Sequence, residues 1–388
     1  MKINQWTLGL AAVGVVSLAS AVNAEEARMN ALQTALSSTT ISGYVDTSIE
    51  WGLGAKNETS LQDNIPFRSG KSDGFNLNVV KLSIEKPMDE SEWASGYKVD
   101  LLFGPDAVVY NQSVNGDYDQ SFNIKQAYVA LRTPVGTGID WKIGTFDTVI
   151  GYETFEAGNN PNFTRSWGYA IEPTQHTGIL GTYRINDNIA IAAGVANTLN
   201  AGINDRNFNT GETWHKTAMG SIALTAPKDS GFLAGSTLYG GVVYGINNPG
   251  SSVGGSPTFS GGRDQGNYYA GATLNTPVAG LKAGVAFDYV ADFGGSSTDV
   301  WVAGLYASYQ ATEKLSFHAR GEYGKLNTAP DVTIADLTGT VQYDLWKNVI
   351  SRLELRWDQA HQPLSVPDEV SGFTETGVSL YANFIYKF

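Results

Sequence analysis

One segment near the C-terminal end of this chain alternates charged and apolar residues, and this pattern restricts the fold more than any other feature. On one face it carries Arg352, Glu354, Arg356 and Asp358, and between them stand Leu, Leu and Trp. Successive side chains of a strand point to opposite sides of the sheet. Four charges in a row cannot enter a dry core, because each unpaired ion would cost several kcal/mol. The charged face must therefore meet water, and the other face must meet an apolar phase.

The same period of two residues recurs along the chain after residue 38. Sixteen segments follow it, and we expect strands to begin near residues 40, 75, 91, 121, 138, 174, 188, 213, 233, 267, 280, 299, 314, 332, 348 and 373. Seven short connections, mostly rich in Pro, Gly, Asn and Asp, alternate with eight long ones. Outer-membrane barrels have short periplasmic turns, long external loops and an even number of strands. The sequence therefore predicts an all-β fold, a transmembrane antiparallel β-barrel of about 16 strands over residues 39–388.

Aromatic residues lie near the ends of these segments. Trp93 and Trp141 stand near one end of the predicted barrel, and Trp51 and Trp357 stand near the other. Two aromatic girdles are typical of barrels that span a bilayer, because amphipathic rings favour the level of the lipid headgroups. The aromatic pattern supports the transmembrane interpretation, and we expect outer-membrane lipids to be partners of the barrel.

The N-terminal region carries a targeting signal. Lys2 is followed by a short apolar stretch over residues 8–18, and Val22-Asn23-Ala24 ends it with small residues. These features predict a secretory signal peptide over residues 1–24 and an exported protein. Residues 25–38 place apolar side chains at helical spacing and are expected to form a short periplasmic segment before the first strand.

Composition excludes several classes of function. The net charge of −13 argues against a nucleic-acid partner, because phosphate binding needs a basic surface. The chain has no Cys, which excludes thiol catalysis and Cys-ligated zinc. Its four His residues are dispersed without metal-ligand spacing. We therefore expect neither a cofactor nor a metal site.

Several strings of residues resemble a known family. They are 43–47 (GYVDT), 73–90 (DGFNLNVVKLSIEKPMDE), 97–107 (YKVDLLFGPDA) and 165–180 (RSWGYAIEPTQHTGIL), together with an aromatic C-terminal strand that ends at Phe388. Together these resemble the OmpL-like β-barrel porin family of Gram-negative bacteria. The resemblance implies an outer-membrane location, a pore for small hydrophilic solutes and a trimeric assembly, but no particular solute.

The candidate site is the lumen, because a barrel of this size leaves an aqueous channel. The connection over residues 149–173 is the longest and resembles the infolded constriction loop of general porins. We hypothesise that Glu153 and Glu156 form the acidic side of a narrow eyelet, opposite wall cations such as Arg132, Lys142 or Arg184. Such a transverse field orients dipolar solutes and biases ion selectivity. The alternative is a surface loop whose carboxylates are merely solvated.

Charges of both signs complete the predicted lining. The inferred inward residues also include Lys81, Lys98, Asp100, Arg320, Glu322, Arg352, Glu354 and Arg356. Arg320, Arg352 and Arg356 form a basic ladder, and a planar guanidinium suits an anion such as phosphate. The interleaved carboxylates favour mutual neutralisation of these charges instead.

The predicted function is passive, size-limited diffusion of small hydrophilic solutes and ions through an outer-membrane porin that is not an enzyme. One alternative is a substrate-selective channel for saccharides or for an anion such as phosphate. Others are a structural barrel with a plugged lumen and an outer-membrane enzyme, for which His361 with Asp358 is the nearest candidate pair.

Overall fold

The computed structural model describes residues 38–53, 65–68, 71, 73–110, 122–199, 202–203, 215–248, 263–363 and 373–388. The predicted signal peptide over residues 1–24 lies outside the described residues, as does the segment 25–37. The strands are β1 (Thr40–Gly52), β2 (Gly74–Lys86), β3 (Ser95–Phe103), β4 (Phe122–Thr133), β5 (Ile139–Asp147), β6 (Gln175–Arg184), β7 (Ile189–Ala196), β8 (Thr217–Thr225), β9 (Thr237–Asn248), β10 (Arg263–Asn275), β11 (Leu281–Ala291), β12 (Val300–Gln310), β13 (Leu315–Leu326), β14 (Val332–Tyr343), β15 (Val349–Gln362) and β16 (Phe373–Lys387).

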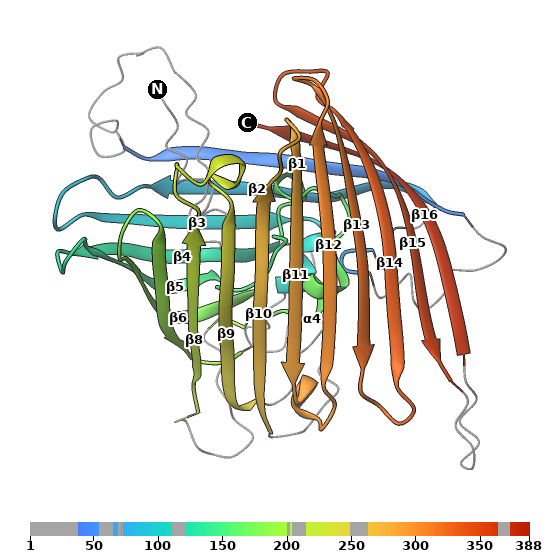
Figure 1. Ribbon diagram of the computed structural model, residues 1–388. Coiled ribbons are helices and arrows are strands. Elements are labelled where there is room, and N and C mark those ends of the chain that lie inside the picture. The colour runs from blue at the N-terminus through green and yellow to red at the C-terminus, as the bar shows by residue number, and fades with distance from the viewer. Residues whose placement is uncertain are drawn as a thin grey trace.

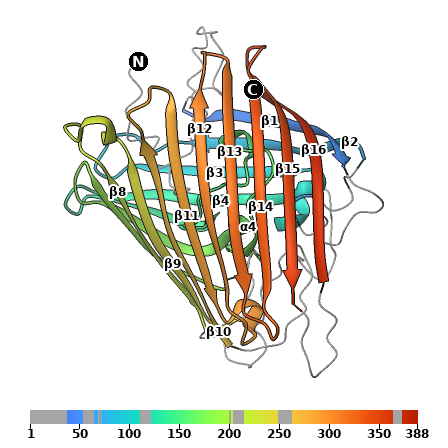
Figure 2. The same ribbon diagram turned by 45° about the vertical axis from the view of Figure 1, so that its right-hand side comes forward.

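These sixteen strands form one closed barrel in which each strand pairs with its neighbours in the sequence. The first and last strands close the ring in antiparallel register, with Tyr44 opposite Lys387 and Trp51 opposite Leu380. Figures 1 and 2 show β8–β16 as one wall and β1–β5 as the opposite wall. The predicted fold class is confirmed, and each strand begins within four residues of its predicted start.

The alternation of faces follows the predicted pattern. On β15, Arg352, Glu354 and Arg356 are at most 5 % exposed, whereas Leu353 and Leu355 are 52 % and 50 % exposed. The charged side chains therefore point into the barrel and the apolar ones point outward. Outward charges would cost about 2–4 kcal/mol each at the bilayer midplane, which explains why the outer face is apolar. Among the described residues, no helix is long and apolar enough to cross a bilayer.

The predicted start of β3 was four residues too early. Trp93 lies in the turn before the strand and is 71 % exposed, because β3 begins at Ser95. Asp89 holds this turn, since its carboxylate accepts hydrogen bonds from the N–H of Ser91 at 3.0 Å and from the Ser91 hydroxyl at 2.5 Å. A short Asp side chain that bonds the backbone two residues on favours a turn over an extended strand.

Candidate functional site

Residues 148–174, the connection between β5 and β6, turn into the barrel and are called the inner loop here. Both ribbon views place its helix α4 (Trp167–Ile171) between the two walls (Figures 1 and 2). The helix begins after Ser166, whose hydroxyl accepts a hydrogen bond from the N–H of Tyr169 at 2.9 Å. Such a cap satisfies one of the N–H groups that the first helical turn leaves unpaired. The local sequence thus shapes the loop, and the barrel walls hold it.

Glu354 on β15 binds the backbone of the inner loop. Its carboxylate accepts hydrogen bonds from the N–H of Phe163 at 2.5 Å and from the N–H of Thr164 at 2.9 Å. It also accepts the hydroxyl of Thr164 at 2.6 Å and the hydroxyl of Thr340, on β14, at 2.6 Å. Unpaired peptide groups away from water are costly. The wall carboxylate therefore replaces the water that the backbone of the loop gives up.

Two arginines on the same strand bind carbonyl groups of the loop. Arg352 donates to the carbonyl of Ala157 at 2.8 Å and to that of Asn160 at 3.0 Å. Arg356 donates to the carbonyl of Arg165 at 2.6 Å. One strand thus offers anionic acceptors to N–H groups and cationic donors to carbonyls, so that both polar groups of the loop backbone find partners.

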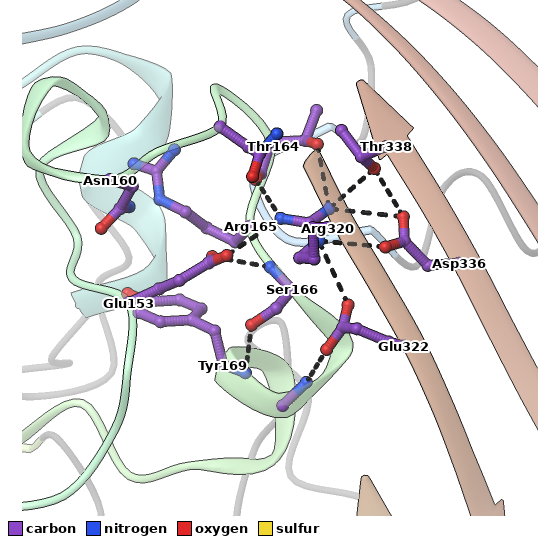
Figure 3. Close-up of polar contacts among 12 residues, drawn as sticks. Glu153, Asn160, Thr164, Arg165, Ser166, Tyr169, Arg320, Glu322, Asp336 and Thr338 are labelled. Atoms are coloured by element: carbon purple, nitrogen blue, oxygen red, sulfur yellow. Dashed lines mark hydrogen bonds and ion pairs between the residues drawn. The ribbon is translucent and has the colours of Figure 1, made fainter. Parts of the chain in front are cut away.

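Arg320 on β13 connects the loop to two strands, as Figure 3 shows. Its guanidinium lies 3.0 Å from the Glu153 carboxylate of the loop and 3.0 Å from the Asp336 carboxylate of β14. It also donates to the carbonyl of Thr164 at 2.7 Å. Its side chain is completely buried. A buried charge of this kind is tolerable only when it is paired and hydrogen-bonded, and both conditions hold here.

Glu322, two residues further along β13, holds the start of helix α4. Its carboxylate accepts the N–H of Trp167 at 2.8 Å and the N–H of Gly168 at 3.0 Å. The indole N–H of Trp167 donates to Asp358 on β15 at 2.9 Å. These contacts orient the helix against β13 and β15.

The middle of the inner loop reaches the wall formed by β2 and β4. Glu156 lies 2.5 Å from the ammonium of Lys81 and 3.2 Å from that of Lys125. Burial raises the pKa of Glu156, but the attraction of Lys125 and Lys81 outweighs it and holds the pKa below its ordinary range. The contact is therefore an ion pair at neutral pH.

Apolar contacts hold the first part of the loop against the remaining wall. The ring of Tyr152 stacks on that of Tyr306 on β12, with centroids 4.1 Å apart. Ile150 packs on β9 at Gly241, where an added Cβ would lie 2.6 Å from the Ile150 side chain. Glycine is therefore the residue that lets the loop approach this strand.

The last residue of the loop near the wall is an acid. Glu172 lies beside Asp288 on β11; Asp288 is buried and Glu172 is partly buried. Burial raises the pKa of Glu172 well above its ordinary value, and the neighbouring Asp288 raises it further. Two neighbouring carboxyl groups disfavour ionisation of both, because their negative charges repel. This end of the loop therefore favours a proton that the Glu156 end does not.

The two loop carboxylates of the eyelet hypothesis face other cations than the three that the hypothesis names. Glu153 faces Arg320, and Glu156 faces Lys81 and Lys125. The cations named in the hypothesis stand elsewhere on the barrel. Their places are as follows: Arg132 pairs with Asp140 at 2.6 Å, Lys142 lies 5.0 Å from the ring of Tyr128, and Arg184 ends β6 as an exposed residue. Arg132 and Arg184 stand at the ends of β4 and β6 that lie away from the inner loop, whereas Lys125, also on β4, stands near the end of β5 from which the loop departs.

The other predicted lining residues point inward as engaged, buried groups. Lys98 lies 3.2 Å from Glu85, and Asp100 lies 3.0 Å from Lys81. Within the basic ladder, Arg320 and Arg356 pair with neighbouring carboxylates, while Arg352 binds Gln342 and the loop carbonyls. The ladder is therefore occupied by the inner loop and by its own wall.

Sequence reasoning missed two contributors, Lys125 and Asp336. Asp336 follows the period of two residues in its strand, so its inward direction could have been found. Lys125 lies where the pairing of β3 with β4 shifts register at Asp100. Such an irregularity interrupts the alternation by which a strand is recognised. Asp336 stands on β14 among Thr and Gly residues, which carry little apolar contrast.

The family model described as "Putative beta-barrel porin-2, OmpL-like" matches residues 38–388. No curated protein matches the chain.

Solved outer-membrane proteins share the fold. The outer membrane channel DcaP of Acinetobacter baumannii is 12% identical, with 90% of this chain and 97% of that chain covered and a TM-score of 0.58. An anion-selective porin from Comamonas acidovorans is 14% identical, with 90% and 99% covered and a TM-score of 0.59. OmpT of Vibrio cholerae, in a trimer form, is 12% identical, with 90% and 99% covered and a TM-score of 0.56.

Proposed function

The chain belongs to the OmpL-like family of β-barrel porins, and from this premise we propose that the inner loop sets the size and rate of what its pore transmits. The protein is an outer-membrane porin, and its family and fold indicate a channel rather than an enzyme. The observation that supports the proposal is the attachment of residues 148–174 to the opposite wall by Glu354, Arg320 and Glu322. A loop held across the lumen narrows the path that a solute must take.

We propose that small hydrophilic solutes and ions pass down their gradients through this narrowed lumen. Glu153, Glu156 and the wall cations Arg320, Lys81 and Lys125 supply charges of both signs at the narrow level. Such a field orients dipolar solutes and penalises apolar ones. Arg320 and Arg356 are fully engaged with carboxylates and loop carbonyls, which favours diffusion by size over capture of an anion on the ladder.

A resting state closed by the inner loop is the second candidate. Most side chains between residues 149 and 169 are buried, including Phe155, Phe163 and Trp167. Dense packing at this level favours a barrel that conducts only when the loop shifts. The two candidates differ in what purified protein does in a bilayer.

We propose further that the protein catalyses no reaction. The nearest catalytic pair in the sequence was His361 with Asp358. Residues three apart on a strand point to opposite faces: the Asp358 carboxylate is buried and bound by Arg356 and Trp167, whereas His361 is exposed and contacts Thr374. We also propose that residues 1–24 direct export and that the protein assembles as a trimer, as OmpT of Vibrio cholerae does in its trimer form.

Single-channel current in a planar bilayer, with the reversal potential in a salt gradient, tests the proposal. Stable, ohmic steps with weak ion selectivity are expected for a diffusion pore. Steps that appear only after an external trigger such as voltage or pH would favour the closed resting state. No current under any of these conditions, from protein that migrates as a folded barrel, would contradict both candidates. Cross-linking in detergent checks the trimer.

A further inference from the structure

A small cavity lies where the first long connection of the barrel meets the inner loop. Its volume is about 20 Å³, and its lining includes Arg68, Lys71, Glu50, Thr164 and Arg165. Arg68 and Lys71 belong to the connection between β1 and β2, and Glu50 belongs to β1 itself. A single water molecule needs about 10–15 Å³ on this measure. The cavity therefore has room for one small group.

Arg68 enters this cavity without a hydrogen-bond partner among the described residues. The residue is 4% exposed, and neither its Nε nor either Nη atom has a partner. The nearest carboxylate belongs to Glu50, whose Oε2 lies 3.8 Å from Nε and is itself unpartnered. The ring of Tyr381 lies 5.7 Å from the guanidinium. A ring contact leaves all five N–H donors of a buried arginine without acceptors, which is costly.

The lining of the cavity has one positive charge in excess, because Arg68, Lys71 and Arg165 stand against the carboxylates of Glu50 and Asp106. Lys71 is neutralised by an ion pair with Asp106. Arg165 is different, because its guanidinium donates to three carbonyls of the inner loop rather than to a carboxylate. Arg68 and Arg165 therefore leave two cations against the single carboxylate of Glu50. Asp46 lies outside the lining and is bound by two asparagines.

We propose that this cavity binds a small monovalent anion on the guanidinium of Arg68. Two sources share the required chemistry: a chloride ion, and the carboxylate end of a solute. Either would supply acceptors to the unpaired N–H groups, and a guanidinium is shaped to bind such groups. The bound anion would join the first connection to the inner loop, because Arg68 and Thr164 both line the cavity. This role is separate from conduction.

The test is the thermal stability of the detergent-solubilised, full-length barrel in different sodium salts at constant ionic strength. Chloride and formate are titrated separately against methanesulfonate, which is too large for a cavity of about 20 Å³. A Tm that rises saturably with chloride alone assigns the site to halide. A rise with formate, with or without chloride, assigns it to carboxylates. Both results support the proposal, and neither requires the pore to conduct.

Three variants identify the residue that binds. R68M is expected to abolish the saturable rise in Tm. R263M is the matched control, because it also removes one positive charge, but from an exposed arginine that pairs with Asp292. This variant should keep the wild-type response. E50Q removes the competing carboxylate and should lower the half-saturating concentration roughly tenfold. A merely structural ion pair between Arg68 and Glu50 predicts no such gain.

A crystal of the wild-type protein soaked in bromide gives a second measurement that needs no variant. An anomalous peak beside the Arg68 guanidinium supports a halide site. The proposal is overturned if the wild-type Tm is the same in all three salts, or if R68M responds as the wild type does. It is also overturned if formate gives no shift and a water, without an anomalous peak, bridges Arg68 and Glu50. In each case conductance of the same preparation reports separately on the porin function.

Discussion

Glu354 and Thr164 are 190 residues apart in the sequence, yet the carboxylate of Glu354 accepts both the N–H of Thr164 at 2.9 Å and its hydroxyl at 2.6 Å. The contact joins strand β15 to the inner loop across the barrel. The neighbouring Arg352 and Arg356 bind carbonyls of the same loop. The position of the loop is therefore determined by the charge pattern of a strand on the opposite wall.

E354A is expected to release this part of the inner loop. The substitution leaves the N–H groups of Phe163 and Thr164 without an acceptor, at a cost of about 3 kcal/mol. Single-channel conductance should rise above the wild-type value. E354Q keeps one acceptor and should lie between the two. E313A, in an exposed turn, is the control and should conduct as wild type. An E354A channel with wild-type conductance would show that this contact does not restrict the pore.

R320M is expected to have the largest effect on stability. It removes the cation shared by Glu153 and Asp336 and leaves both carboxylates buried and uncompensated, which costs about 3–5 kcal/mol. The thermal unfolding temperature should fall, and R320K should recover part of the loss because it keeps the charge but not the planar fork. R263M serves as the control of equal charge. Equal unfolding temperatures for R320M and R263M would contradict the assigned role of Arg320.

Acid should weaken the contact of Glu156 with Lys81 and Lys125. The pKa of this carboxyl is held below its ordinary range, so the ion pair stabilises the loop above a pH of about 4.3, the value for an unfolded glutamate. That contribution is lost as the pH falls toward the folded pKa. Conductance of the wild type should therefore rise as the pH is lowered from 5 toward 3. E156Q should have a higher conductance that varies less with pH over this range. If the conductance of E156Q rises with acid as steeply as that of the wild type, the Glu156 carboxyl is not the cause of the response.

Alkali should weaken the other end of the loop. The pKa of Glu172 lies above its ordinary value because of burial and of Asp288. The protonated form is therefore favoured in the docked loop, and this stability is lost as the pH rises through the folded pKa. Conductance should therefore increase as the pH rises through the folded pKa of Glu172. E172Q stays neutral and should remove that increase without changing the acid response attributed to Glu156. An E172Q profile that matches the wild type would count against the assignment.

A lysine at Leu355 tests which face of β15 meets lipid. The Leu355 side chain is 50% exposed on the outer surface. L355K should cost about 2–4 kcal/mol if the position lies near the bilayer midplane and should reduce the yield of folded barrel in lipid vesicles. L355A, which stays apolar, is the control. The loss is expected in vesicles and should be much smaller in detergent, where the charge can reach water.

The barrel could be predicted from the sequence because alternate residues of each strand face the lumen and the lipid, and their polarity differs accordingly. Arg352 and Leu353 are adjacent, and their contrast alone fixes which side is wet. Errors at strand starts were local. Trp93 is a residue type that favours strands, but it lies in a turn in which Asp89 accepts a hydrogen bond from the N–H of Ser91. The alternation of polar and apolar residues does not reveal such a side-chain contact.

The partners of the inner loop could not be predicted in the same way. Glu153 and Glu156 were expected inside the lumen, but the sequence contains no information on where a loop of this length crosses. Its path depends on contacts with strands that are not its sequence neighbours, such as Glu153 with Arg320 on β13 and Glu156 with Lys81 on β2. The cations Arg132, Lys142 and Arg184 were chosen by their charge, which does not tell at which height of the barrel the loop meets the wall; Lys125 lies on the same strand as Arg132 but nearer to the loop.

The attachment of the inner loop through its backbone has a consequence for how such a protein diversifies. Glu354, Glu322 and Arg352 bind peptide groups, and every amino acid except proline offers the same N–H and carbonyl. A mutation at an exposed loop position such as Asn159 therefore changes the side chain that a passing molecule meets without removing these contacts. The surface that the loop presents to the lumen can thus change while the wall that holds the loop stays the same.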